Sequence, residues 1–118
     1  MNRGPLADLR VVELTDLRGA LCGRILADLG ADVVKVLRPA TAIANYETTA
    51  YRYRNANKRA VAIDLHAADG RIRFDTLLDA ADVLIENLGP KQQRSHHLVP
   101  QAVARRHPRL VHVAKSLT

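Results

Sequence analysis

The hydrophobic positions along the chain alternate between two patterns. Short, almost continuously apolar runs, typical of buried strands, occupy residues 10–14, 32–37, 60–65, 82–86 and 110–113. Between them, residues 19–29 and 69–80 have apolar positions at helical spacing and predict amphipathic helices, and residues 100–107 predict a short helix. Apolar strands that alternate with helices are typical of a parallel sheet with helices on both faces. The pattern therefore predicts an α/β fold with a parallel sheet of about five strands.

Parallel sheets of this kind bind their ligands beyond the carboxyl ends of the strands. That edge is predicted to be formed by residues 15–20, 38–40, 64–68, 86–90 and 114–118. Residues 38–57 show no periodicity and predict a long surface loop. Loops of that length are uncommon unless they serve a function or move.

The turn after the first predicted strand does not have the glycines of a dinucleotide-binding site. It offers glycine only at Gly19 and Gly23, and the second strand ends in Arg38 instead of an acidic residue. NAD binding is therefore disfavoured. Phosphate binding at the start of the first helix stays possible through Arg18 and Gly19. Arg38 is as consistent with a nucleotide phosphate contact as with a solvated charge. Lys58 and the neighbouring arginine, taken alone, are more typical of surface charges than of a basic pocket.

Composition and charge narrow the class of protein further. The 118 residues are 47% hydrophobic and 25% charged, which is typical of one globular domain. The net charge is +6, and 14 of the 18 cationic side chains are arginine. Arginine suits bidentate recognition of phosphate or carboxylate, so nucleic acid, a phosphorylated cofactor and an acidic partner all remain open. No apolar run is long enough for a membrane span, and the charged first ten residues are unlike a signal peptide, so a cytoplasmic protein is expected.

The cysteine and histidine residues predict no metal site. A single cysteine, Cys22, excludes an internal disulfide framework, and the five histidines have no ligand spacing. Cys22 is expected to pack on the apolar face of the first helix, which would consist of Leu21, Cys22, Ile25, Leu26 and Leu29.

Five segments in order resemble the class III CoA-transferase family, which includes formyl-CoA and carnitine CoA-transferases and α-methylacyl-CoA racemases. They are PLADLRVVEL (5–14), LADLGADVVKV (26–36), NKRAVAIDL (57–65), ADVLIENLGP (81–90) and HPRLVHV (107–113). Together they extend over almost the whole chain. The resemblance implies that residues 1–118 form a single N-terminal, CoA-binding segment of the family's Rossmann-like large domain, which is incomplete here.

The resemblance also implies a ligand and its contacts. Coenzyme A would be bound as substrate or ligand, without a metal, by Leu17, Arg18, Gly19, Arg38, Lys58, Asn87, Leu88 and Gly89. The family's catalytic aspartate lies downstream of these segments, so no catalytic residue is assigned and the chain alone is expected to be inactive. Two departures affect the site. The turn into the first helix is one residue shorter than in the family, and Leu88 stands where the family has an aromatic residue.

Two other functions remain as alternatives. The chain could be an interaction module that completes its sheet with a complementing chain or as a homo-oligomer, since the family's enzymes are interlocked dimers. Nucleic-acid binding through Tyr51 to Arg59 is less favoured, because the family explains Lys58 and Arg59 better. Neither nucleic acid nor a membrane is expected as a partner.

Overall fold

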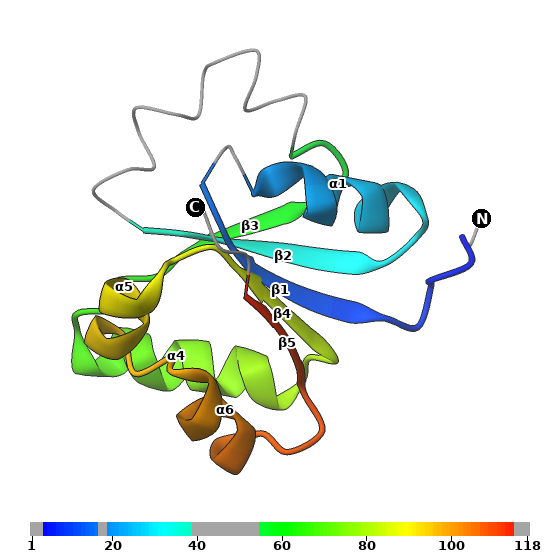
Figure 1. Cartoon of the computed structure of the whole chain (residues 1–118). Coiled ribbons are helices and arrows are strands. Elements are labelled where there is room, and N and C mark those ends of the chain that lie inside the picture. The colour runs from blue at the N-terminus through cyan, green and yellow to red at the C-terminus, as the bar shows by residue number, and fades with distance from the viewer. Residues whose placement is uncertain (1–3, 17–18, 39–54, 115–118) are drawn as a thin grey trace.

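A computed structural model describes residues 4–16, 19–38 and 55–114 (Figure 1). Its strands form one parallel sheet in the order β3-β2-β1-β4-β5. The bounds are Arg10–Leu14 for β1, Asp32–Leu37 for β2, Arg59–Ala62 for β3, Val83–Glu86 for β4 and Val111–Ala114 for β5. The predicted α/β fold with a parallel sheet of five strands is confirmed.

Helices cover both faces of the sheet (Figure 1). One face carries α1 (Ala20–Asp28), and the other carries α4 (Ala68–Asp79), α5 (Pro90–Ser95) and α6 (Pro100–Arg106). Because side chains alternate along a strand, β1 contributes to two separate cores. Val12 and Leu14 pack into the larger core with Phe74 of α4, whereas Val11 packs into the smaller core with Ala27 of α1.

The sequence pattern locates most elements to within one or two residues and differs at two places. The third strand ends at Ala62, three residues early, because Asp64 begins the turn in which its carbonyl accepts the N–H of Ala67 at 3.2 Å. The helix α5 was not predicted. Its sequence, PKQQRS, has no apolar positions, and none of its residues is buried, so it carries no hydrophobic period.

The orientation of α1 contradicts the face predicted from its large apolar residues. Leu21, Ile25 and Leu29 are 46%, 52% and 42% exposed, and Cys22 is exposed as well. The buried positions are instead the small residues Ala20, Gly23 and Ala27. The prediction that Cys22 packs in the core is therefore wrong. The reason is that the side chains of Glu13 and Lys58 lie between α1 and the sheet, and residues as small as Gly23 and Ala20 leave room for them.

Candidate functional site

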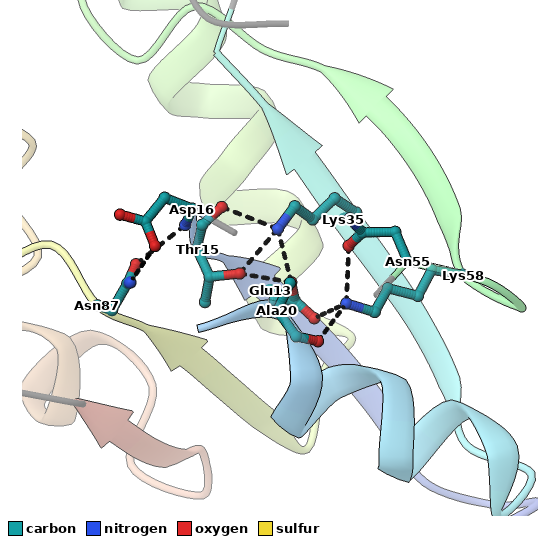
Figure 2. Close-up of polar contacts among 8 residues, drawn as sticks. All are labelled: Glu13, Thr15, Asp16, Ala20, Lys35, Asn55, Lys58 and Asn87. Atoms are coloured by element: carbon teal, nitrogen blue, oxygen red, sulfur yellow. Dashed lines mark hydrogen bonds and ion pairs between the residues drawn. The ribbon is translucent and has the colours of Figure 1, made fainter. Parts of the chain in front are cut away.

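The charged side chains beneath α1 form a buried ion cluster of Glu13, Lys35 and Lys58 (Figure 2). Glu13 lies opposite Lys35 in the register of β1 and β2, and Lys58 reaches the same carboxylate from the residue before β3. The Nζ of Lys35 lies 2.7 Å from Oε2 of Glu13, and the Nζ of Lys58 lies 2.6 Å from Oε1. Their side chains are 0%, 4% and 1% exposed, in the order Glu13, Lys35, Lys58. A carboxylate with two ammonium groups gives the cluster one excess positive charge.

Both lysines also bind the loop that joins β1 to α1. The Nζ of Lys35 donates to the carbonyl of Thr15 at 2.8 Å and to its hydroxyl at 2.7 Å. The Nζ of Lys58 donates to the carbonyl of Ala20 and to Oδ1 of Asn55, each at 2.8 Å. The loop is thus held at Thr15, the first residue after β1, and at Ala20, the first residue of α1.

This environment alters the chemistry of Lys58. Burial lowers the pKa of the Lys58 ammonium, and the attraction of Glu13 only partly offsets that effect. The interpretation of Lys58 as a surface charge is therefore wrong. It is right for Arg59, whose side chain is 69% exposed and forms a bidentate pair with Asp32 at 2.9 and 2.7 Å.

Asn87, at the end of β4, holds the β1–α1 loop from the other side. Its side-chain oxygen accepts the N–H of Asp16 at 3.1 Å, and its side-chain nitrogen donates to the Asp16 carboxylate at 2.7 Å. Gly19 lies against the same side chain, since a Cβ there would be 3.0 Å from Nδ2 of Asn87. Leu17 and Arg18 lie outside the described residues. The structure therefore brings Gly19 and Asn87, two of the predicted contact residues, into one place.

Leu88 and Gly89 follow Asn87 and are placed differently from each other. The Leu88 side chain is buried in the core beside α4, so only its main chain lies at the sheet edge. Gly89 has a φ of 81° and a ψ of 163°, with no heavy atom within 4 Å of the position of a Cβ. That backbone conformation belongs almost exclusively to glycine.

Basic groups from three loops gather at the carboxyl edge of the sheet. The rings of His66, after β3, and His96, after α5, lie 4.9 Å apart between centroids. Burial lowers the pKa of His96, and the nearby His66, Arg38 and His97 lower it further. The sequence analysis did not identify this group, because residues 30 positions apart in the chain give no spacing signal. Of the loop predicted over residues 38–57, the structure describes only Arg38 and 55–57.

A second buried carboxylate, that of Glu86 at the end of β4, contacts side chains of α5 and β5. It accepts hydrogen bonds from the side chain of Gln93 at 2.6 Å and from the N–H of Leu88 at 3.0 Å, and it lies 2.7 Å from Nε2 of His112. Burial alone would raise the pKa of Glu86, but His112 and these two donors together lower it. The Nδ1 of His112 is buried and has no hydrogen-bond partner among the residues that the structure describes.

Within the described ranges, no group of three or more histidine, cysteine or acidic residues could hold a metal ion. Across the same part of the chain, no helix is both long and apolar enough to cross a membrane. Of the segment considered for nucleic-acid binding, Tyr51 to Arg59, residues 51–54 lie outside the described residues.

A five-stranded parallel sheet in the order β3-β2-β1-β4-β5, with helices on both faces and basic groups at its carboxyl edge, defines a Rossmann-like α/β domain. The chain belongs to CoA-transferase family III, whose sequence model matches residues 6–117. The resemblance seen in the sequence is thereby confirmed.

Individual relatives support the same assignment. The chain is 35% identical over 96 residues to a succinyl-CoA–D-citramalate CoA-transferase of Chloroflexus aurantiacus, which covers 73% of this chain and 24% of that protein. It is 39% identical over 97 residues to a succinyl-CoA:mesaconate CoA-transferase of Haloarcula hispanica, covering 71% and 24%. The crystal structure of Rv3272 from Mycobacterium tuberculosis matches with a TM-score of 0.86 at 30% identity, covering 98% of this chain and 34% of that one. The chain thus spans only a part of the length of these relatives.

Proposed function

We propose that this chain is the N-terminal, CoA-binding part of a family III CoA-transferase that moves coenzyme A between acyl groups, or of a related acyl-CoA racemase. The main support for the proposal is that the β1–α1 loop, Arg38 and the residues after β4 lie at the same edge of the sheet. Family membership supports coenzyme A as the ligand. The proposed contacts are Leu17, Arg18, Gly19, Arg38, Asn87, Leu88 and Gly89, with Lys58 acting from beneath the loop.

The chemistry of these groups suits the phosphates of coenzyme A. The backbone N–H groups in the first turn of an α-helix have no partners within the helix, and a helix N-terminus such as that of α1 favours an anion. Arg38 adds a guanidinium that can bind a phosphate through two parallel hydrogen bonds. The side chain of Leu88 packs in the core, so we expect it to contribute its main chain only.

Catalysis needs more than this binding edge. The family resemblance places the nucleophilic aspartate in a later segment than the five that match here, so we propose that residues 1–118 by themselves bind coenzyme A without transferring it. Turnover by the purified 118-residue protein, free of other transferases, would contradict this expectation. The cytoplasmic location expected from the sequence remains a prediction.

Calorimetric titration of the protein with coenzyme A tests the binding proposal. Arg38→Met is expected to weaken binding about tenfold or more, because a hydrogen bond to a charged group contributes about 1.5–3 kcal/mol. Arg59→Met is the matched control, since Arg59 is exposed and pairs with Asp32 at the start of the neighbouring strand. No saturable binding by the unaltered chain, or equal losses in the two variants, would refute the proposed site.

A second candidate function is association with another chain, and the exposed face of α1 favours it. Leu21, Ile25 and Leu29 point away from the sheet, and Val111 and Val113 of the terminal strand β5 are 58% and 41% exposed. Apolar surface of this kind marks interaction sites. The partner would be a second copy of the chain, as in a dimer, or a complementing chain.

Sedimentation velocity at increasing protein concentration tests this second candidate. We expect self-association that is lost in Ile25→Lys and kept in Ile72→Lys, which alters an isoleucine that is 68% exposed, against 52% for Ile25, in α4 on the opposite face of the sheet. A monomer at every concentration would leave only the complementing chain as partner. Equal loss in the two variants would exclude the α1 face.

A further inference from the structure

The β1–α1 loop is held from below by groups that do not reach the ligand edge themselves. We propose that Glu13 is a positioning residue, which through Lys35 and Lys58 fixes both ends of this loop in the geometry that binds coenzyme A. This inference rests on the proposed function for its ligand, but the positioning itself is a property of the chain alone.

The two ammonium groups lie at opposite ends of the β1–α1 loop (Figure 2). The Nζ of Lys35 binds the carbonyl at which the loop begins, that of Thr15, and the Nζ of Lys58 binds the carbonyl at which α1 begins, that of Ala20. Separate oxygens of the Glu13 carboxylate contact the two lysines. One carboxylate therefore connects both ends of the loop to strands β1 and β2 and to the residue that enters β3.

The placement of both lysines depends on the negative charge of Glu13. An ammonium group with almost no exposure needs an anionic partner, because leaving water without one is strongly unfavourable. Glu13 is the carboxylate in contact with either lysine. Without its charge, both lysines would turn toward water and release the carbonyls of Thr15 and Ala20. Among the described residues, Asp16 would still be held by its two hydrogen bonds with Asn87.

Replacement of Lys58 can separate the stability of the fold from the positioning of the loop. Replacing Lys58 with methionine leaves Glu13 and Lys35 as a neutral buried pair and fills the same volume with an apolar side chain. The fold should therefore keep its stability while the restraint on Ala20 is lost. If Lys58 had a merely structural role, its replacement would change the stability of the fold and the order of the loop together. If it positions the loop, its replacement changes the order of the loop and leaves the stability of the fold unchanged.

The test combines hydrogen exchange with ligand binding in Lys58→Met, Glu13→Gln and their double variant. Gly19 supplies the probe, because its N–H donates to the carbonyl of Asp16 and closes the loop. We expect Gly19 to exchange at least about tenfold faster in Lys58→Met, while the amides of β1 and β4 keep their protection. The Kd for coenzyme A should also rise, to the extent that the population of the binding-competent loop falls.

The double variant separates charge balance from positioning. Glu13→Gln alone removes the negative charge of the cluster, which raises its net positive charge, and should lower the melting temperature. Adding Lys58→Met removes one positive charge and returns the cluster to its original net charge. We expect the melting temperature to recover only in part in the double variant, because Lys35 still lacks its carboxylate partner, while Gly19 exchange stays fast and coenzyme A binding stays weak. Arg59→Met, one residue from Lys58, serves as the control and should match the unaltered chain in every measurement.

The outcomes distinguish this inference from the proposed function. An unchanged hydrogen-exchange rate of the Gly19 amide in Lys58→Met would overturn the positioning role. So would a double variant in which the Gly19 amide regains its protection together with the melting temperature. If the unaltered chain fails to bind coenzyme A while Gly19 responds as expected, the proposed function is wrong and the positioning of the loop stands.

Discussion

Gly23 is the position at which the contact between α1 and the sheet can be tested most directly. A Cβ at this residue would overlap Oε1 of Glu13 and would lie 3.1 Å from the Nζ of Lys58. At an exposed helix position Gly→Ala stabilises by about 1 kcal/mol, because alanine loses less conformational entropy on folding. At Gly23 we expect the opposite sign, because the methyl group displaces a buried carboxylate from its ion pairs.

The size of the effect follows from three contributions. The helix gains about 1 kcal/mol from alanine, overpacking costs about 1–3 kcal/mol, and breaking a buried ion pair outright costs about 3–5 kcal/mol. Partial displacement of Glu13 therefore gives a net loss of about 2–4 kcal/mol. Since the entropy of unfolding is about 2.1 cal/mol/K per residue, each kcal/mol lowers the Tm by about 4 °C at this chain length. We expect Gly23→Ala to melt about 8–16 °C below the unaltered protein.

Differential scanning calorimetry measures this difference, and the neighbouring residue provides the control. Cys22→Ala changes an exposed side chain on the same helix and should alter the free energy of unfolding by no more than about 0.5 kcal/mol. A Gly23→Ala variant as stable as the unaltered chain, or more stable, would show that α1 does not rest on the Glu13 carboxylate, and the positioning inference would lose its basis.

Three further changes test other parts of the structure. The pKa of His96 is lower in the fold than its ordinary value of 6.5, so protonation opposes folding: stability should fall as the pH drops below about 6.5, and His96→Gln should flatten that part of a urea-unfolding pH profile. The pKa of Glu86 is also lowered, from 4.5, so its charged form stabilises the fold above that pH. Glu86→Gln should therefore cost about 1–3 kcal/mol at pH 7, and the difference from the unaltered chain should shrink as the pH falls below 4.5; a constant difference would contradict the assigned hydrogen bonds. Gly89→Ala should cost about 1–3 kcal/mol in thermal melts from backbone strain alone, because no atom would collide with the new methyl group, and an unchanged Tm would argue against the φ of 81°.

Strand positions were predictable from the sequence because buried parallel strands are apolar on both faces. The runs at β1, β2 and β4 are largely apolar, with Glu13, Lys35 and Glu86 as buried charged exceptions, and their predicted bounds agree with the structure to within one residue. The helix α5 has no such property, because none of its residues is buried and its Gln93 side chain is hydrogen-bonded to Glu86 of a distant strand. A local pattern cannot reveal an element held in this way.

The candidate site was less predictable, because its order depends on contacts between distant residues. Glu13 interrupts an apolar run and has the spacing of an ordinary strand residue, so its partnership with Lys58, 45 positions away, is not visible in the sequence. The face of α1 was misassigned because its large apolar residues dominate the helical period, although small residues meet the charged sheet. The proximity of Gly19 and Asn87 was anticipated through the family resemblance and the edge rule for parallel sheets.

The strand order has a consequence for how the chain folds during synthesis. The central strand β1 is made first, but its neighbour β4 follows about 70 residues later, as the register pair Val11 and Val83 shows. One edge of β1 therefore stays unpaired while most of the chain is being translated, at a rate of about 5–20 residues per second. Sheets that depend on such distant pairings fold slowly and expose apolar strand edges meanwhile. The nascent chain should consequently need protection from aggregation until β4 has left the ribosome.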